Sequence, residues 1–485
     1  MKIKNLNLNS SEEVTHKIVH EILDLFHVEF DGESDLNIEN FFDGENVETH
    51  LEFDGKKFTR SEKILPNEIQ RAEVNRIIKK NLYKIFLEEF EKDPAPWGIL
   101  HGVRPTKLVH RWLNAGESEK KIFTRLENDY LASEEKSRLL IEVSKRQRKI
   151  LEAVDKKIVS IYIGIPFCVT RCLYCSFTSN ILPSVEKISE FMSALEKDII
   201  DAKKTIDEFK LSVQTIYIGG GTPTSLPEKF FDEMLSMVAE NFYSESVEEF
   251  TVEAGRPDTI SKSKIETMIR THVSRISLNP QTMNQQTLDR IGRKHSPQNI
   301  IDSFHQLRTM TDFYINMDLI LGLPGEDHRD VENTIDQILQ LEPDGITIHS
   351  LALKKGSRLK MQLEDYELPS DDEVRKMYDV AVEKIQSRQY FPYYLYRQSY
   401  MRGQLENIGY TRSKIGIYNV QIMGEMQTII GIGSAATTKI FDPIPNRLMS
   451  TFHAKDLITY LKDVDYYIEK RSNLFKTIYS REDFR

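Results

Sequence analysis

The chain has 485 residues, enough for two or three domains, and its 40% hydrophobic and 29% charged residues are those of an ordinary globular protein. Its net charge of −10 argues against non-specific binding to nucleic acid. The sequence shows neither a signal-like N-terminus nor a long apolar run, so we expect a cytoplasmic protein that does not span a membrane.

Residues 1–155 are predicted to form a small α+β accessory domain that ends in a helical linker. An amphipathic helix is predicted after a short first strand. Residues 47–53 then alternate in polarity, and the Asp54-Gly55 pair after them is a strong hairpin signal. A long charged helix is predicted over residues 67–91.

The three cysteines of the chain, Cys168, Cys172 and Cys175, lie within eight residues of one another. Random placement would give such crowding on the order of one time in a thousand. The apolar, β-branched residues 158–165 before them predict a buried strand, which Pro166 ends. The thiols therefore follow the carboxyl end of a strand, where parallel α/β folds bind their ligands.

The Cys-x-x-x-Cys-x-x-Cys spacing can hold a soft metal or an iron–sulfur cluster. A 4Fe–4S cluster with three protein thiolates has one iron left open, and an open metal position favours chemistry over a purely structural role. A structural zinc would need a further Cys/His pair, whereas the nearest histidines are His110 and His272. Disulfides are not expected in a long chain with three cysteines and no secretory signal.

Residues 156–365 repeat a strand–helix unit six times, which predicts parallel strands with outer helices. The predicted strands cover residues 158–165, 213–218, 250–253, 275–279, 313–321 and 345–351. Six units are too few for a closed eightfold barrel, so we expect an α/β fold with a partial (β/α)6 barrel. Residues 366–485 are predicted to form a C-terminal α+β segment that packs against the open side of this barrel.

Polar and glycine residues follow several of these strands where they end. Gly219-Gly220-Gly221-Thr222 follows the second strand, and glycine lets a ligand approach the backbone closely, although such a run can also be only a tight turn. Glu253 ends the third strand, Gln281 follows the fourth, and Asp318 lies in the fifth. Charged groups in an apolar barrel mouth need partners or a function.

The cysteine motif resembles that of the radical S-adenosylmethionine (SAM) superfamily, in which three cysteines bind a 4Fe–4S cluster and SAM chelates the fourth iron. The stretch Tyr162-Ile163-Gly164-Ile165-Pro166-Phe167-Cys168 is similar to the oxygen-independent coproporphyrinogen III oxidase group, specifically its HemZ-type members. The resemblance covers residues 155–440 and implies a partial radical SAM barrel.

The resemblance also implies the site residues. Cys168, Cys172 and Cys175 match the cluster ligands. Positions matching SAM contacts are Tyr162, Tyr174, Gly220, Gly221, Thr222, Glu253, Gln281, Arg293, Asp318 and Thr437. In the family the glycine motif holds the SAM amino group, the glutamate bonds the ribose, and Gln281, Arg293 and Asp318 match contacts to a second SAM molecule. No residue is assigned a catalytic role.

As a function, the resemblance implies a radical SAM oxidoreductase of haem and porphyrin biosynthesis. Members decarboxylate coproporphyrinogen III to protoporphyrinogen IX through a 5′-deoxyadenosyl radical, with an electron donor such as flavodoxin or ferredoxin. A haem chaperone of the same family, or a radical SAM enzyme that acts on another tetrapyrrole, are the alternatives.

Two departures bear on this choice. The Pro-Gly-x-Arg-Tyr segment at the oxidases' N-terminus is missing here. The chaperones' His-Asn-x-x-Tyr-Trp motif is replaced by Tyr418-Asn419-Val420-Gln421-Ile422-Met423, which argues against haem ligation at this position.

Overall fold

The computed structural model describes residues 1–485 except 11–12, 65–69, 91–94, 154, 178, 399–400, 443–446 and 482–485, and leaves out the side chains of residues 13–15, 70 and 90. The chain divides into two compact units, Met1–Ser144 with Arg397–Ser399, and Lys145–Tyr396 with Tyr400–Arg485. Helix α5 (Glu134–Glu152) carries the chain from the first unit to the second. None of the described helices is long and apolar enough to cross a membrane.

The first unit contains a four-stranded sheet in the order β1-β2-β3-β4. Its elements are β1 (Leu6–Asn9), α1 (Glu13–Leu25), β2 (Leu36–Phe42), β3 (Asn46–Phe53), β4 (Lys56–Lys63), α2 (Gln70–Phe90), α3 (Thr106–Asn114) and α4 (Glu119–Tyr130). The predicted hairpin is confirmed, because β3 and β4 pair antiparallel and both turn residues, Asp54 and Gly55, have positive φ angles of 52° and 76°. Residues 67–69 and 91 of the predicted long helix lie outside the described residues.

The second unit is built on an eleven-stranded sheet, counted over the described residues, in the order β13-β14-β12-β11-β10-β9-β8-β5-β15-β16-β17. Its strands are β5 (Ile158–Ile165), β8 (Ser212–Gly220), β9 (Glu249–Glu253), β10 (Arg275–Ser277), β11 (Tyr314–Leu321), β12 (Gly345–Ser350), β13 (Phe391–Tyr396), β14 (Asn407–Thr411), β15 (Thr428–Gly433), β16 (Thr437–Asp442) and β17 (Arg447–Phe452). The six predicted barrel strands are β5 and β8–β12, and all pair in parallel.

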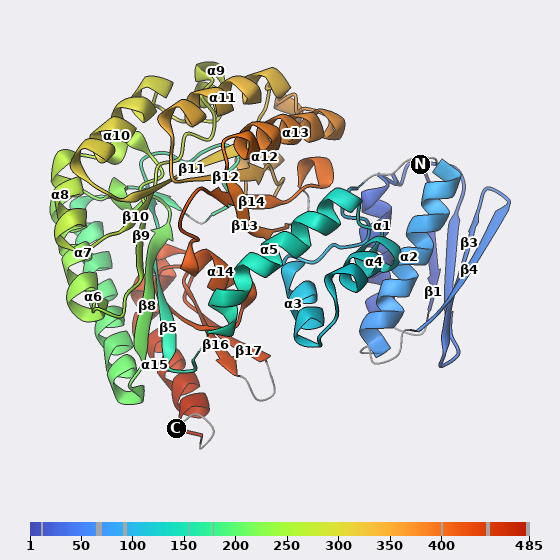
Figure 1. The fold of residues 1–485 in the computed structure, drawn as a ribbon, viewed down its shortest axis with the longest axis horizontal. Helices are drawn as coiled ribbons and strands as arrows, with labels where there is room; N and C mark the ends of the chain where they lie inside the picture. Colours follow the sequence, from blue (N-terminus) through green and yellow to red (C-terminus); the bar gives the residue numbers. More distant parts are fainter. Residues whose placement is uncertain are drawn as a thin grey trace. The chain divides into compact units, whose positions relative to one another are not determined.

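Helices connect these strands and lie along their outer side, as α6, α7, α8, α10 and α11 show in Figure 1. The helices of this unit are α6 (Val185–Phe209), α7 (Glu228–Phe242), α8 (Lys262–Arg270), α9 (Gln285–Arg290), α10 (Pro297–Met310), α11 (His328–Leu341), α12 (Arg358–Met361), α13 (Asp371–Ser387), α14 (Ile417–Gly424) and α15 (Leu457–Tyr479). Strand residues such as Ile161, Ile218 and Ile348 are fully buried, as parallel strands covered by helices require. The predicted α/β fold is confirmed.

The C-terminal segment extends the barrel sheet at both edges. Strands β13 and β14 add antiparallel beside β12. Strand β15 instead pairs in parallel with β5, with Thr428 opposite Val159 and Gly433 opposite Gly164, and β16 and β17 follow antiparallel. The sequence predicted packing against the open side of the barrel, but it did not predict that β15 would become a seventh parallel strand.

A buried ion pair joins α15 to α6 behind β15. The side chains of Asp198 and Arg471 are fully buried, and Arg471 Nη1 donates to Asp198 Oδ1 at 2.5 Å and to the carbonyl of Gly431 at 3.0 Å. The second carboxylate oxygen of Asp198 accepts from the Gly433 N–H at 2.8 Å. These bonds fix the carboxyl end of β15 beside β5.

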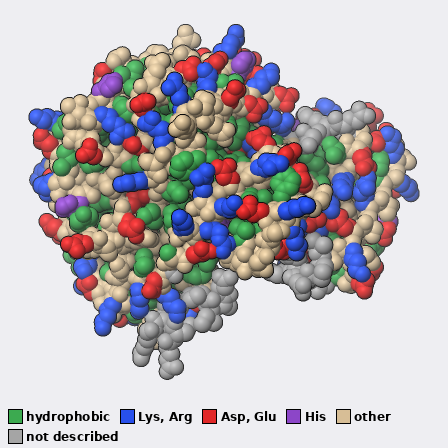
Figure 2. Space-filling model, in the orientation of Figure 1, with side chains coloured by type: hydrophobic (Ala, Val, Ile, Leu, Met, Phe, Trp, Pro, Cys, Tyr) green, Lys and Arg blue, Asp and Glu red, His purple; other side chains and the backbone are tan. Residues whose placement is uncertain are grey.

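On the face seen in Figure 2, acidic and basic side chains are mixed over the surface. This mixture accords with the modest excess of acidic residues, 75 against 65 basic ones.

Candidate functional site

The loop that carries the cysteines is closed at its base by two short strands. β6 (Phe167–Cys168) pairs in parallel with β7 (Asn180–Ile181), with Cys168 opposite Ile181. The Asn180 N–H donates to the carbonyl of Pro166 at 2.7 Å, and the Leu182 N–H to that of Cys168 at 3.0 Å. All three cysteines therefore lie on one closed loop at the carboxyl end of β5, as predicted.

The same loop is fastened to the neighbouring barrel loops. The Leu173 N–H donates to the carbonyl of Ile291 at 2.9 Å, and Thr170 Oγ1 donates to that of Gly292 at 3.0 Å. The buried Arg256 donates to Thr170 Oγ1 at 2.8 Å. The loop is thus held from two sides before any ligand binds.

The thiols are partly buried and free. Burial raises the pKa of Cys168, against an opposing hydrogen bond from Thr222, whose Oγ1 lies 3.6 Å from Sγ. Burial also raises the pKa of Cys175. Because iron binds thiolates, loading a cluster must release protons from this loop. Among the described residues, no three His, Cys, Asp or Glu side chains are grouped so as to hold a single metal ion.

The glycine turn after β8 packs directly against the strand that leads to the cysteines. The Gly221 N–H donates to the carbonyl of Ile165 at 2.8 Å, and the Thr222 N–H to that of Phe167 at 2.6 Å. Gly220 has a φ of 105°, which favours glycine, and a Cβ on Gly221 would lie 2.4 Å from the Phe167 carbonyl oxygen. The turn therefore needs glycine to reach this position.

Gly221→Ala is expected to weaken SAM binding, in protein reconstituted with iron and sulfide, by about tenfold or more. The new methyl group would clash with the backbone of Phe167, which cannot move away without disturbing the turn. Equilibrium dialysis with labelled SAM measures this change. Gly102→Ala is the matched control, since a Cβ there meets nothing within 4 Å. An unchanged SAM affinity in the Gly221 variant would contradict the prediction.

Glu253 lies on the inner side of the barrel among other ionisable groups. Tyr217 donates a hydrogen bond to Glu253 Oε1 at 2.5 Å, and the ring of Tyr162 stacks on that of Tyr217 with centroids 6.1 Å apart. Burial raises the pKa of Glu253 to about 7; the hydrogen bond from Tyr217 opposes this shift and the charge of Asp318 adds to it. The carboxyl can therefore exchange a proton near neutral pH.

This shift predicts a pH dependence of stability. The unfolded chain ionises Glu253 near pH 4.5, whereas the folded protein holds the proton until about pH 7, so stability falls as the pH rises between these values. Glu253→Gln is expected to stabilise the metal-free protein at pH 8 but not at pH 5, by on the order of 1–3 kcal/mol. Urea unfolding at the two pH values measures the difference, and an equal gain at both would contradict it. Burial also raises the pKa of Glu326 to about 7. The Glu253 variant should therefore keep part of the dependence of stability on pH.

Gln281 and Asp318 are brought together by the backbone. The Gln281 N–H donates to the carbonyl of Asp318 at 2.9 Å, and Gln281 has a positive φ of 66°. Asn316 holds one oxygen of the Asp318 carboxylate at 2.6 Å, and His349 lies 3.7 Å from the other. Gln281, which follows the fourth strand, and Asp318, which lies in the fifth, are therefore neighbours in the barrel.

Arg293 connects this part to the cysteine loop. Its guanidinium donates to the carbonyls of Asn279 at 2.7 Å and Gly255 at 3.0 Å, and to the hydroxyl of Tyr174 at 3.4 Å. Tyr174 stands between Cys172 and Cys175 in the sequence. The arginine therefore spans the ends of β9 and β10 and the loop.

The buried polar atoms of this part of the barrel that lack a hydrogen-bond partner among the described residues include Arg293 Nε, Gln281 Oε1 and Asn279 Oδ1. Such atoms cost free energy unless a ligand satisfies them. An amino-acid nucleoside such as SAM offers both donors and acceptors. The unpaired polar atoms therefore fit SAM, and the three thiols of one loop fit a 4Fe–4S cluster, as the sequence predicts.

Thr437 lies farther along the sheet. It begins β16, and a Cβ on Gly431 would lie 2.5 Å from its carbonyl carbon. Gly431 in turn pairs with Tyr162 of β5. Thr437 is therefore separated from Tyr162 by one strand.

Two tyrosines of this region were not predicted as site residues. The rings of Tyr217 and Tyr418 stack with centroids 4.4 Å apart, and the ring of Tyr162 stacks beside both, at 6.1 Å from Tyr217 and 6.3 Å from Tyr418. Alternation along β8 places Tyr217 and Gly219 on the same face, and this pattern could have identified Tyr217. Tyr418 comes from α14, whose first N–H groups bond Glu249, and no local pattern indicates that contact.

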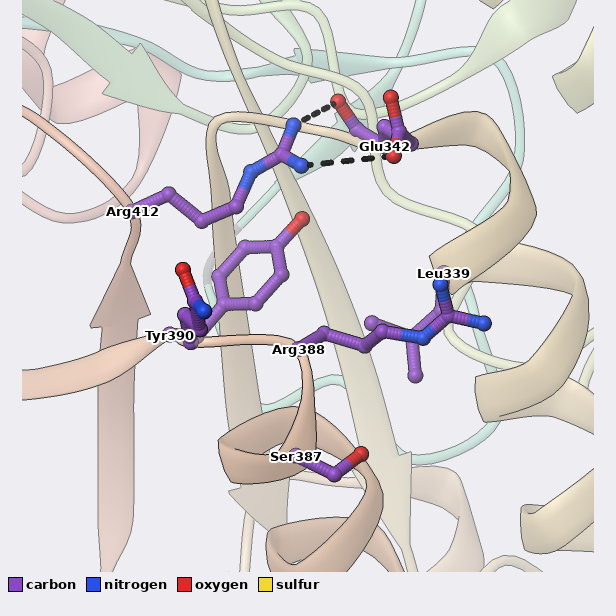
Figure 3. Close-up of a pocket in the computed structure, with 7 residues that line it drawn as sticks. Leu339, Glu342, Ser387, Arg388, Tyr390 and Arg412 are labelled. Atoms are coloured by element: carbon purple, nitrogen blue, oxygen red, sulfur yellow. Dashed lines mark hydrogen bonds and ion pairs between the residues drawn. The ribbon is translucent and has the colours of Figure 1, made fainter.

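A separate pocket of about 250 Å³ lies at the other end of the barrel strands, where β12 begins (Figure 3). It is lined by Leu339, Glu342, Ser387, Arg388, Gln389, Tyr390 and Arg412. Arg412 bonds the carbonyl of Glu342 at 2.8 Å, as the figure shows. The pocket contains none of the predicted site residues.

Comparison with known proteins places these features in a class. The sequence signature described as the Radical SAM superfamily matches residues 162–338. Coproporphyrinogen III oxidase (HemN) from Escherichia coli has a similar fold, with a TM-score of 0.53 and 19% identity over 66% of this chain and 71% of its own. Fold, cysteine loop and signature together define a radical SAM protein.

Two curated relatives narrow the class. The oxygen-independent coproporphyrinogen-III oxidase-like protein HemZ of Bacillus subtilis is 37% identical over 393 residues, which cover 79% of this chain and 78% of HemZ. The heme chaperone HemW of the same organism is 32% identical over 47% of this chain and 60% of its own length. The chain belongs to the radical SAM superfamily as a HemZ-like protein.

Proposed function

We propose that the protein catalyses the oxygen-independent oxidative decarboxylation of coproporphyrinogen III to protoporphyrinogen IX. The observation that carries the proposal is the 37% identity to an oxidase-like HemZ over most of both chains. The unpaired polar atoms beside the cysteine loop support it, because they suit a nucleoside cofactor.

We propose the following roles for the residues. Cys168, Cys172 and Cys175 hold a 4Fe–4S cluster, and SAM lies between the glycine turn, Glu253 and the group around Arg293. When bound, these cofactors would supply a one-electron cleavage that yields a carbon radical able to take a hydrogen atom from a propionate side chain.

The chain itself would position SAM. Gly220 and Gly221 let the turn lie close against the backbone of Ile165 and Phe167, and Tyr217 fixes the orientation of the Glu253 carboxylate by its 2.5 Å hydrogen bond. Two backbone carbonyls accept hydrogen bonds from Arg293 and fix its guanidinium, so its unpartnered Nε has a fixed orientation. Preorganisation of this kind lowers the cost of ordering a ligand.

The test is an anaerobic reconstitution with iron and sulfide, followed by incubation with SAM, dithionite and coproporphyrinogen III. After oxidation of the products, chromatography and mass spectrometry should find protoporphyrin, which is lighter than coproporphyrin oxidised in the same way by two CO₂ and four hydrogen atoms. Unchanged coproporphyrinogen alongside SAM cleavage would refute this substrate, and a gain of a methyl group would indicate a different tetrapyrrole reaction.

The haem-chaperone alternative has its own test. Tyr418, where the chaperones carry histidine, is 7% exposed and stacks on Tyr217. Stoichiometric haem capture in an anaerobic titration, without formation of 5′-deoxyadenosine, would favour the chaperone over the oxidase.

A further inference from the structure

Arg256 is a buried cation that contacts the cysteine loop, yet it matches none of the proposed cluster ligands or SAM contacts. It lies three residues after the end of β9, and its side chain is 3% exposed. Nη1 donates to Thr170 Oγ1 at 2.8 Å, and Thr170 stands between Cys168 and Cys172. Deep burial of a charge costs free energy unless partners or a function compensate for the lost hydration, so this guanidinium is not an ordinary surface charge.

Asp258 is the acidic partner of this guanidinium. Nε and Nη2 of Arg256 donate to the two carboxylate oxygens at 3.0 and 3.1 Å, so Asp258 occupies one edge of the guanidinium while Nη1 turns to the loop. Burial opposes ionisation of Asp258, but these hydrogen bonds hold its pKa below its ordinary value. The acid is 28% exposed, so solvent screens its charge more than it screens that of Arg256.

The turn that carries Arg256 is itself held in place. Thr259 Oγ1 donates to the carbonyl of Arg256 at 2.7 Å. The buried Lys264 donates from Nζ to the carbonyls of Thr224 at 2.6 Å and Thr259 at 3.0 Å. The guanidinium therefore reaches the cysteine loop from a fixed base and can fix the position of Thr170.

The charge of Arg256 is felt at the thiols. Burial raises the pKa of the Cys168 thiol, and the positive charge of Arg256 opposes that rise. The buried ring of His295 lies 4.0 Å from Asp258 but adds no charge, because burial and the two nearby guanidinium groups lower its pKa to about 3. A cluster bound by Cys168 would therefore lie within the field of a buried cation.

We propose that Arg256 is a positioning residue that holds the cysteine loop in place for the cluster and raises the reduction potential of that cluster. The inference rests on the 4Fe–4S cluster of the proposed function. Reduction adds one electron, and so one negative charge, to the cluster, and a nearby buried cation favours the reduced state. Asp258 has the opposite effect on the potential. The ion pair therefore sets how easily the cluster accepts the electron that SAM cleavage requires.

The test measures the midpoint potential of the cluster in reconstituted protein by electron paramagnetic resonance during a dithionite titration, without SAM or porphyrinogen. Arg256→Gln is expected to lower the ratio of reduced to oxidised cluster at a fixed potential about tenfold, which is about 59 mV for one electron. Asp258→Asn removes the opposing negative charge and should raise the same ratio by about threefold or more. Arg256→Lys keeps the positive charge and should change the ratio by less than about threefold.

The hold on the loop is measured in the metal-free protein. Hydrogen–deuterium exchange of residues 166–177 should be faster by about threefold or more in Arg256→Gln. Arg275→Gln is the matched control, because the side chain of Arg275 is 7% exposed and donates to Tyr393 at 3.1 Å at the start of β10. This control should change neither the potential nor the exchange of the loop.

Shifts of the same sign in Arg256→Gln and Asp258→Asn would overturn the inference, because loosened structure rather than charge would then explain them. An unchanged potential in either variant would also overturn it. If Arg256→Gln holds no iron, the potentials of Asp258→Asn and Arg256→Lys decide. A wrong porphyrin substrate leaves all these results untouched, whereas an unmodified protein that binds no cluster would refute the proposed function and this inference with it.

Discussion

Cys172→Ala is expected to abolish cluster binding and SAM cleavage. The three thiols of the loop are all the cysteines of the chain, so no other thiol can replace the lost one. A cluster held by two thiolates is left with two open irons, and removal of a ligand undoes both metal affinity and the chemistry that depends on it. Iron analysis after anaerobic reconstitution and chromatography of 5′-deoxyadenosine measure the two losses.

The fold itself should survive this change. The loop is closed by backbone bonds between β6 and β7 and fastened through Leu173 and Thr170, none of which uses the Cys172 side chain. Unfolding of the metal-free protein in urea should therefore shift by no more than about 0.5 kcal/mol. Val169→Ala, in the same loop and 37% exposed, should keep its iron. A Cys172 variant that retains a cluster and cleaves SAM would contradict the proposed ligand set.

Asp198→Asn is expected to cost the second unit about 3–5 kcal/mol of unfolding free energy. The substitution keeps the side-chain volume but removes the fully buried carboxylate that Arg471 contacts at 2.5 Å, so that the partly exposed Asp201, at 2.9 Å, must balance the buried guanidinium instead. It also weakens the hydrogen bond that the Gly433 N–H donates to Asp198. Hydrogen–deuterium exchange of peptides from α6 and α15 separates this unit from the first and should show faster exchange in both.

The same two helices offer a matched control. Lys197 and Asp465 form an ion pair at 3.4 Å with side chains 59% and 78% exposed. Asp465→Asn should change the free energy of unfolding by less than about 0.5 kcal/mol, because exposed pairs contribute little. If the two substitutions changed the free energy of unfolding equally, burial would not explain the contribution of the Asp198–Arg471 pair to stability.

The barrel strands could be predicted because they are short apolar runs that alternate with amphipathic helical segments, and several of them are followed by glycine or polar residues. The parallel β15 could not be placed in the same way. Its sequence, Thr428–Gly433, is as apolar as that of β5, but its neighbour is decided by contacts between residues far apart, such as the bond from Ser160 to Gln427. The apolar pattern of a segment predicts that it forms a strand, but not which strands it pairs with in the sheet.

The candidate site shows a similar division. The cysteine loop could be predicted from spacing alone, since three cysteines crowd into eight residues. The proposed SAM contacts came from resemblance, and the structure brings Gln281 beside Asp318 and Tyr174 beside Arg293. The stack of Tyr217 on Tyr418 joins residues about 200 positions apart, which no local pattern encodes.

The pairing of β15 with β5 has a consequence for how the protein is made. When β5 is translated, its partner on one side, the segment opposite Val159 that begins at Thr428, is still about 270 residues from being translated. Until then the strand that leads to the thiols has an open edge, and unpaired edges invite wrong pairing. Iron delivered to the nascent chain would meet thiols whose supporting strand still lacks its permanent neighbour.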